Sequence, residues 1–192
     1  MENNDLFEDF IFTDRLTKQL KVLVEKPRIL RLRPILCFHG NPGVGKTSFG
    51  KKLMSHFCGD YQYFPMNERS LKNNFIEEQI KPLYRTVSLF DDGEKMFPRG
   101  IFLDEFNNLT KKEQERFKVI FDQMKEKDTL VIVCLNSIKG RLSKVLSDPI
   151  HSRVYPINFN VREEENEINE VLNKVMDRYP LLPRLRVRGL IP

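Results

Sequence analysis

Short apolar runs alternate along this chain with segments whose apolar residues recur every three or four positions. The runs have strand length and lie at 34–39, 61–64, 101–105, 130–135 and 155–159. The segments with helical spacing lie at 14–26, 48–57, 70–80, 110–124 and 163–176. This alternation predicts an α/β fold, in which a parallel sheet lies between two layers of helices.

Capping residues set the expected limits of two helices. Thr13 with Asp14 can cap the first helix, and Pro27 is expected to end it. Thr110 and Glu113 have the spacing of a capping box, so a helix is expected to start there.

Proline and glycine predict further boundaries. The helix over 70–80 is expected to stop before Pro82, and Pro156 indicates that the last strand is an edge or irregular strand. Glycine beside aspartate or proline predicts loops at 59–60, 91–93 and 98–100.

Composition places few limits on function. The chain has 192 residues, of which 40% are hydrophobic and 31% charged, so we expect one domain or one domain with a small appendage. A net charge of +5 permits contact with nucleic acid without arguing for it. The polar, acidic start does not resemble a secretory signal, and the apolar runs are too short to cross a membrane.

The cysteines do not have the spacing of metal ligands. Cys37, Cys58 and Cys134 are far apart, and two of them lie in expected core strands. We therefore expect buried, reduced thiols, as in an intracellular protein of the cytoplasm or nucleus. The three histidines are scattered and indicate no metal site.

A phosphate-binding loop is the most informative motif. It fits G-x-x-x-x-G-K-[ST] and consists of Gly40, Asn41, Pro42, Gly43, Val44, Gly45, Lys46 and Thr47, with Ser48 next. It stands between an expected strand and an expected helix, which is the order that such a loop requires. Its amides and Lys46 would bind the phosphates of ATP, and the Thr47 hydroxyl would ligate Mg²⁺.

Polar residues at the ends of two later strands fit this loop. Asp104 and Glu105 follow an apolar run, and Asn136 follows another. In open parallel sheets, ligands bind at the carboxyl ends of the strands, where these side chains would meet the loop. Asp104 would then hold Mg²⁺, Glu105 would activate a water, and Asn136 would bind that water or the γ-phosphate. Taken alone, the acidic pair is equally typical of a solvated turn, and asparagine is a common turn former.

An arginine before the last strand completes the candidate catalytic set. Arg153 follows Ser152 there, and an arginine supplied by a neighbouring subunit can stabilise the charge of the transition state. Most of the 32 lysines and arginines in such a chain are surface charges, which is the alternative for Arg153.

These motifs, in this order, resemble those of the AAA+ ATPases, and within them most the small subunits of clamp loaders (replication factor C-like). The resemblance covers about residues 5–160. It extends to the start of the chain, 5–16, which in that family packs near the adenine, and to 66–69. It implies an ATPase with ATP and Mg²⁺ in which Asn136 is the sensor-1 residue and Arg153 the finger acting in trans. It also implies related AAA+ subunits, DNA and a sliding clamp as partners, and no membrane.

The sequence departs from that family in three places. Val154 replaces a cysteine, the stretch from Asn136 to Arg153 is longer than expected, and the chain stops at Pro192. We expect a nucleotide-binding domain at 1–160 and a partial helical lid or tail at 161–192, in which Arg184 and Arg186 are candidates for a second sensor by position alone.

Three other functions remain open at this stage. A viral superfamily-3-type helicase shares the core, although it carries a hairpin between the acid pair and the asparagine. An ATP-binding scaffold subunit with little hydrolysis would explain a short lid, and a small-molecule kinase fits the acid pair poorly. Contact with DNA would involve the basic residues after the sensor strand, Lys139, Arg141 and Lys144, which are equally typical of a solvated face.

Overall fold

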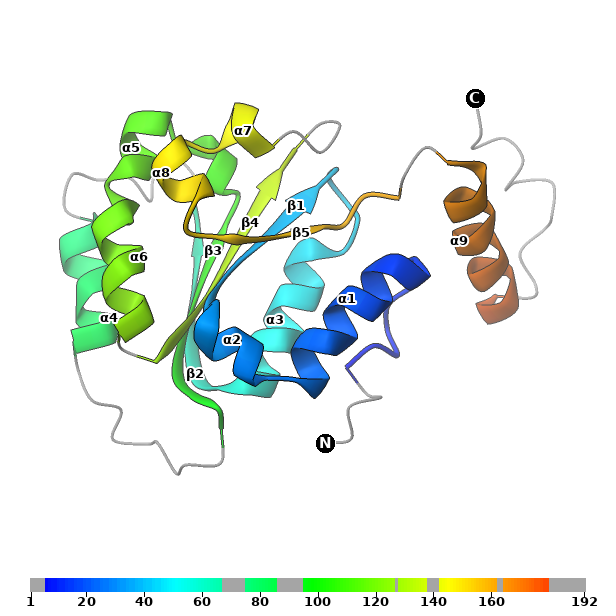
Figure 1. The fold of residues 1–192 in the computed structure, drawn as a ribbon, viewed down its shortest axis with the longest axis horizontal. Helices are drawn as coiled ribbons and strands as arrows, with labels where there is room; N and C mark the ends of the chain where they lie inside the picture. Colours follow the sequence, from blue (N-terminus) through cyan, green and yellow to red (C-terminus); the bar gives the residue numbers. More distant parts are fainter. Residues whose placement is uncertain are drawn as a thin grey trace.

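The computed structural model describes residues 6–66, 75–85, 95–126, 128–137, 142–161 and 164–179. Within them, a five-stranded sheet has the order β2-β3-β4-β1-β5, and every pairing in it is parallel (Figure 1). Its strands are β1 Ile35–Gly40, β2 Cys58–Pro65, β3 Phe97–Asp104, β4 Thr129–Asn136 and β5 Tyr155–Asn158. The expected α/β fold is confirmed, and so is the edge position of the last strand, which pairs with β1 alone in the sheet order.

Helices cover both faces of this sheet (Figure 1). One face carries α1 Asp14–Glu25, α2 Arg28–Leu32 and α3 Lys46–Phe57. The other face carries η2 Ile76–Ile80, α4 Lys81–Arg85, η3 Phe106–Asn108, α5 Lys111–Glu115, α6 Phe117–Glu126, α7 Leu142–Val145 and α8 Asp148–His151. Helix α9, Glu165–Arg178, stands away from the sheet, beyond the start of α1. None of the helices in the described ranges has the length and hydrophobicity that crossing a bilayer requires.

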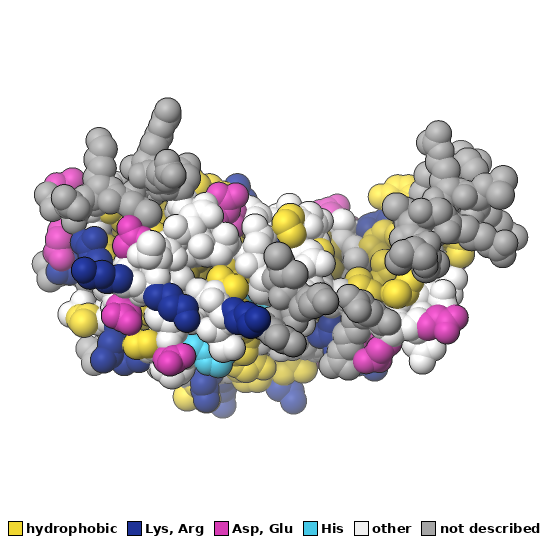
Figure 2. All heavy atoms as spheres, turned by 90° about the horizontal axis from the view of Figure 1, so that it is seen from above, with side chains coloured by type: hydrophobic (Ala, Val, Ile, Leu, Met, Phe, Trp, Pro, Cys, Tyr) yellow, Lys and Arg dark blue, Asp and Glu magenta, His cyan; other side chains and the backbone are white. Residues whose placement is uncertain are grey.

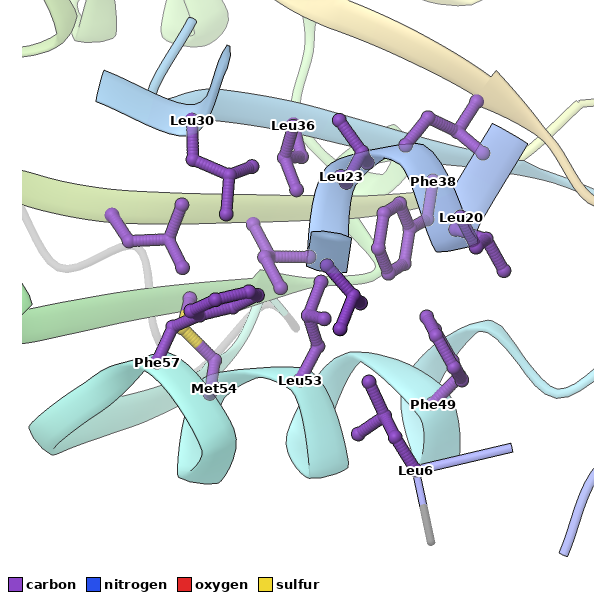
Figure 3. Packing of buried hydrophobic residues seen from close by; sticks show 14 of the residues in the cluster. Leu6, Leu20, Leu23, Leu30, Leu36, Phe38, Phe49, Leu53, Met54 and Phe57 are labelled. Carbon is purple, nitrogen blue, oxygen red and sulfur yellow. The ribbon is translucent and has the colours of Figure 1, made fainter. Parts of the chain in front are cut away.

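Successive strand residues supply the two halves of the core. In β1, Leu36 and Phe38 pack among the side chains of α1 and α3, whereas Ile35 and Cys37 pack on the face of α6. Figure 3 shows the first half, in which Phe49 and Leu53 of α3 point toward the strands. β1 and β4 are buried on both faces and consist of continuous apolar runs, whereas the edge strands β2 and β5 are partly exposed.

Aromatic rings join the start of the chain to the phosphate-binding loop. Phe49, in the first turns of α3, lies 5.6, 5.2 and 5.4 Å from the ring centroids of Phe7, Phe10 and Phe12. A side-chain atom at Gly45 would lie 3.7 Å from the rings of Phe10 and Phe12. The acidic and aromatic segment at the start of the chain therefore packs directly beside this loop.

The helix expected over 110–124 is two helices. Thr110 and Glu113 form the predicted capping box, but α5 ends at Glu115 and α6 begins at Phe117. Gln114 is buried and holds α5 against the following segment, since its amide donates to the Leu109 and Val145 carbonyls and accepts from the Ser147 N–H. A buried amide with three partners fixes this region as a packed core position does.

Two of the loop predictions are wrong. Residues 59–60 lie in β2 and residues 98–100 lie in β3. Gly100 is required by close packing rather than by a turn, because a side-chain carbon there would come within 2.8 Å of the sulfur atoms of Cys58 and Met54. Gly59 similarly faces the Pro98 carbonyl oxygen, 3.3 Å from where its side chain would start.

The expected stop at Pro82 is also wrong. The helix continues through Pro82 to Arg85, and the N–H of Lys81 bonds to the carbonyl of Ile76 in a wider π turn. A π turn just ahead of the proline accommodates its ring and its missing N–H without ending the helix. Of the expected helix over 70–80, the first residues, 70–74, lie outside the described part of the chain, as does the expected loop at 91–93.

The first helix, the last helix and the cysteines agree with expectation with small shifts. Thr13 caps α1, which ends at Glu25, and the short helix α2 after Pro27 was not expected. Helix α9 begins at Glu165, and Ile168, Leu172 and Val175 on its apolar stripe are half-buried. Cys37, Cys58 and Cys134 are buried free thiols, as predicted, and burial raises the pKa of the Cys37 and Cys58 thiols to about 12.

Candidate active site

The phosphate-binding loop connects the end of β1 to the start of α3, as the sequence predicts. Gly43 and Gly45 have φ angles of +80° and +87°, in the left-handed region that favours glycine. Gly45 is also the residue before the first turn of α3, so the free N–H groups of this helix lie at the loop. Amide groups and the helix dipole together favour an anion at this position.

Lys46, near the end of the phosphate-binding loop, is buried. Its ammonium group donates to the carbonyls of Gly40 and Asn41, at 3.0 and 2.6 Å, and to Oδ1 of Asn136 at 3.1 Å. Burial lowers the pKa of Lys46, whereas the charge of Asp104 raises it. The lysine therefore joins the ends of β1 and β4 at the point where a phosphate would neutralise it.

Two oxygen-bearing side chains that could ligate a metal, Thr47 and Asp104, lie together beside this lysine. The Thr47 hydroxyl donates to Oδ2 of Asp104 at 2.9 Å, and the N–H of Glu105 donates to Oδ1 at 2.9 Å. A hydroxyl and a carboxylate next to a phosphate-binding loop are the ligands that Mg²⁺ takes in nucleotide sites. The described residues hold no cluster of three His, Cys, Asp or Glu side chains, so phosphate oxygens and water would complete such a site.

Glu105 has a backbone conformation that is rare outside glycine. Its φ and ψ angles are 54° and 36°, and it is the single residue between the end of β3 at Asp104 and the start of η3 at Phe106. Local hydrogen bonds hold this turn, since the Asn108 N–H donates to the Glu105 carbonyl and the Asn108 amide donates to the Glu105 carboxylate at 3.3 Å. Holding a residue in such a conformation costs about 1–3 kcal/mol, which is typical of functional sites. The turn leaves the Glu105 carboxylate exposed at the mouth of the site.

Asn136 is fixed from two sides. Its side-chain oxygen accepts from Lys46, and its backbone N–H donates to the side-chain oxygen of Asn107 at 2.8 Å. The hydroxyl oxygen of the next residue, Ser137, lies within hydrogen-bond distance, 3.1 Å, of Nδ1 of His39. The His39 side chain is buried. Burial, with the charge of Lys46, lowers the pKa of His39 to about 4, so the imidazole is neutral at pH 7. These bonds set the spacing of the ends of β1, β3 and β4.

The loop is also attached to α1 and α9 through Asn160. The Asn160 side-chain oxygen accepts from the Asn41 N–H at 2.6 Å and would lie 2.7 Å from a side-chain carbon at Gly40. Arg15 donates to the Asn160 carbonyl at 2.9 Å and forms an ion pair with Glu167 of α9, also at 2.9 Å. Glycine is thus needed at position 40 by the close approach of Asn160.

A cavity of about 280 Å³ lies among these groups, at the carboxyl ends of the strands. Its lining consists of Pro42, Gly43, Gly45, Lys46, Thr47, Ser48, Asp104, Glu105, Leu135 and Asn136. Figure 2 views this end of the molecule. Of the other predicted residues, Gly40 and Asn41 contribute carbonyls to Lys46, and Val44 packs on the core.

Arg153 is not among the residues that line this cavity. It lies between α8 and β5, where Nε and one terminal nitrogen bond to the two carboxylate oxygens of Asp122, both at 2.9 Å. Its other terminal nitrogen donates to the Pro149 carbonyl at 2.8 Å. The structure therefore brings Lys46, Asp104 and Asn136 together and keeps Arg153 apart from them.

Sequence reasoning assigned no role at the site to three residues that contact its central groups. Tyr63 of β2 donates its hydroxyl to Oδ2 of Asp104 at 2.9 Å, while Asn107 and Asn160 hold Asn136 and Asn41. None of them belongs to a spaced motif that names its role. Asn107 follows the acid pair closely enough to have suggested a contact, whereas the roles of Tyr63 and Asn160 depend on strand register.

Comparison with known proteins gives matches over most of the chain. The profile of the ATPase family associated with various cellular activities (AAA) matches residues 36–157. Replication factor C small subunit 2 of Pyrobaculum islandicum is 28% identical over 171 residues, which are 86% of this chain and 48% of that protein. The replication factor C small subunit of Saccharolobus solfataricus is 26% identical over 171 residues, 86% of this chain and 47% of that protein. The chain thus spans about half the length of the curated relatives it matches.

A solved structure has the same fold. The RuvB Holliday junction branch migration motor of Thermotoga maritima superposes with a TM-score of 0.54 at 17% identity, covering 91% of this chain and 53% of that one. At this identity, the likeness concerns the arrangement of the sheet and helices alone.

Proposed function

The chain belongs to the ATPase family associated with various cellular activities, and from that premise we propose that it binds and hydrolyses ATP as a subunit of a clamp-loader-like assembly. One observation carries the proposal. A lysine, a hydroxyl, two consecutive carboxylates and an asparagine, from three separate segments, surround one cavity. Phosphoryl transfer to water requires mainly positioning and neutralisation of charge, which this set of groups can supply.

The roles of the residues follow from their positions. The loop amides and Lys46 would bind the β- and γ-phosphates, and Thr47 and Asp104 would hold Mg²⁺, which neutralises phosphate charge when bound. Glu105 is exposed at the cavity mouth, where it would orient a water and accept its proton. Asn136, held by Lys46 and Asn107, would bind the γ-phosphate or that water.

A second hollow offers room for the base of the nucleotide. It has a volume of about 470 Å³ and lies between the aromatic segment before α1 and the end of α9. Its lining includes Phe10 and Phe12, which also flank Gly45 of the phosphate-binding loop. We propose that residues 1–160 form the nucleotide-binding domain and that 161–192 begin a lid, because Lys174 and Arg178 of α9 line one side of this hollow.

We propose that Arg153 acts on the nucleotide of a neighbouring subunit. It stands outside the cavity of its own chain, and its partner Asp122 is half-exposed, so the guanidinium can exchange that carboxylate for a phosphate. An arginine used in this way requires an assembly, with further copies or related AAA subunits as partners.

Hydrolysis measured against protein concentration tests this proposal. If Arg153 acts in trans, turnover per subunit rises as subunits associate, and the assembled mass rises with a non-hydrolysable ATP analogue. A turnover per subunit that stays constant from dilute to concentrated protein would contradict the role in trans, and the absence of ATP binding would contradict the proposal as a whole.

Two observations bear on the other functions. Between Glu105 and Asn136 the structure describes every residue except Lys127, and these residues form η3, α5, α6 and β4 rather than a hairpin. This argues against a superfamily-3-type helicase, which an unwinding assay on forked DNA would check. A scaffold subunit is favoured only if ATP binds tightly and no phosphate is released with any partner added.

DNA and a sliding clamp remain proposed partners. Lys144 lies in α7, while Lys139 and Arg141 are outside the described residues. Figure 2 shows Lys and Arg side chains, interspersed with acidic ones, on the part of this end that α5 to α8 form. Contact between that surface and DNA phosphates would weaken as salt is raised.

A further inference from the structure

We infer that Tyr63 is a positioning residue for the magnesium-binding carboxylate, Asp104. The inference rests on the proposed function, since it concerns the metal of that same site. The Tyr63 hydroxyl donates to Oδ2 of Asp104 at 2.9 Å, and this oxygen also accepts from the Thr47 hydroxyl. The carboxylate is therefore held by a residue of the edge strand β2, outside the phosphate-binding loop and the strand that carries it.

Strand register brings the tyrosine to this position. Tyr63 pairs with Phe102 in the neighbouring strand β3, two residues before Asp104 and on the same face of the sheet. The rings of Tyr63 and Phe102 are stacked, with centroids 5.4 Å apart. The tyrosine then leans along the strand direction, so that its hydroxyl reaches the carboxylate at the end of β3.

Helix α3 packs against both rings. A side-chain carbon at Gly50 would lie 2.5 Å from the Phe102 ring, so only glycine lets the helix lie this close to it. The ammonium group of Lys51 lies 4.0 Å from the centre of the Tyr63 ring, within the range of a cation–π contact. Thr47 is on the same helix, one turn earlier, and bonds to the same oxygen of Asp104 as Tyr63 does.

The two donors to Oδ2 have different fates when a metal is bound. The Thr47 oxygen would itself be a metal ligand, so the metal would also set its position relative to the carboxylate. The Tyr63 hydroxyl is no ligand in this arrangement, so its hydrogen bond can persist and hold Asp104 in the same orientation with and without the metal. Partners of this kind orient metal ligands, and their loss weakens metal binding by about 10- to 100-fold.

Substitution of Tyr63 by phenylalanine separates the hydroxyl from the ring. Tyr63→Phe keeps the stacking on Phe102 and the contact with Lys51 and removes only the bond to Asp104. Tyr61→Phe is the matched control, because Tyr61 is two residues earlier on the same face of β2 and pairs with Gly100, four residues before Asp104. The probes are Mn²⁺, followed by its paramagnetic resonance signal with saturating ADP, and a fluorescent ADP analogue measured in EDTA.

We expect Tyr63→Phe to weaken Mn²⁺ binding by about 10-fold or more. The affinity of Tyr63→Phe for the ADP analogue in EDTA should change by less than about 2-fold, because the phosphate-binding groups are untouched. In Tyr61→Phe, the affinities for Mn²⁺ and for the ADP analogue should each change by less than about 2-fold. If Tyr63→Phe binds Mn²⁺ as tightly as the unsubstituted protein, the inference about Tyr63 is overturned and the proposed function is not. The same holds if Tyr63→Phe loses affinity for Mn²⁺ and for the ADP analogue equally. Failure of the unsubstituted protein to bind ADP would overturn the proposed function beneath it.

Discussion

Two cationic side chains of the candidate catalytic set lie in opposite surroundings. Lys46 is buried, with 7% of its surface exposed, and bonds to two carbonyls and an amide oxygen. Arg153 lies at an edge of the molecule, where its partner is the carboxylate of Asp122, whose side chain is 49% exposed. The lysine lines a cavity within its own chain, whereas the arginine lies outside that cavity.

If Arg153 acts in trans, as we propose, this difference indicates how the site would be divided between subunits. Groups that bind the nucleotide in every state belong in the interior, where neighbouring strand ends fix them. A group that must arrive with a neighbour belongs on the surface, where its partner in the isolated chain has to be easily replaced. The pair is partly exposed, with 21% of the Arg153 side chain and 49% of the Asp122 side chain accessible, so releasing the arginine costs less than breaking a buried pair.

The largest expected effect comes from removing the arginine at the edge. Arg153→Ala should lower ATP turnover by about 10³- to 10⁵-fold, because the charge of the transition state loses its partner, and leave ATP binding intact. Steady-state hydrolysis and equilibrium binding of ATP measure the two quantities.

A mixing experiment gives the control for Arg153→Ala. Combined with Lys46→Ala, which keeps the arginine, it should recover part of the turnover, since a neighbour then supplies the missing group to an intact cavity. No recovery from the mixed variants would show that the arginine acts within its own chain.

The next largest effect concerns the cavity itself. Glu105→Gln should lower turnover by about 10²- to 10⁴-fold, because the amide cannot take the proton of the attacking water, and ATP should remain bound. A single-turnover hydrolysis assay measures this. Glu115→Gln, at an exposed position of α5, is the matched control in that assay. Full activity of Glu105→Gln would assign the base to another residue.

Loss of the buried lysine should weaken the binding of ATP, and not only the rate of its hydrolysis. Lys46→Ala should weaken ATP affinity by about 10- to 100-fold, because a charge-assisted bond to phosphate contributes about 1.5–3 kcal/mol. Titration calorimetry measures this, with Lys52→Ala as the control, since Lys52 lies on the same helix and pairs with Asp9 instead. Unchanged affinity in Lys46→Ala would contradict the site.

The smallest effect is expected at the partner of the arginine. Asp122→Ala should change the free energy of unfolding by less than about 1 kcal/mol, as for other exposed ion pairs, and should preserve turnover. Chemical denaturation and the hydrolysis assay measure both. A loss of turnover as large as that of Arg153→Ala would mean that the pair, rather than the free guanidinium, is what the assembly needs.

Much of the site could be predicted from the sequence, because its residues lie in motifs that are recognised from the neighbouring sequence. The loop from Gly40 to Thr47 needs only a strand before it and a helix after it, and both are local patterns. Asp104, Glu105 and Asn136 could be placed beside the loop by one rule, which is that parallel strands end at the same edge of a sheet.

The errors have a common physical origin. The glycines at 59 and 100 were interpreted as turn residues, but they lie in strands where β2, β3 and α3 approach closely. Pro82 was interpreted as a helix end, but a π turn accommodates it. In each case the local preference of a residue was overruled by a packing contact or a backbone adjustment that the sequence does not display.

By itself, then, the sequence determined the alternation of strands and helices, the phosphate-binding loop and the order of the polar strand ends, since periodicity and local spacing specify these. Only the tertiary structure decided that Tyr63 and Thr47 share one oxygen of Asp104, that Asn107 holds Asn136 while Asn160 holds Asn41 of the loop, and that Arg153 turns to Asp122. These contacts join residues from different elements, and they depend on strand order and register, which the packing of the whole core fixes.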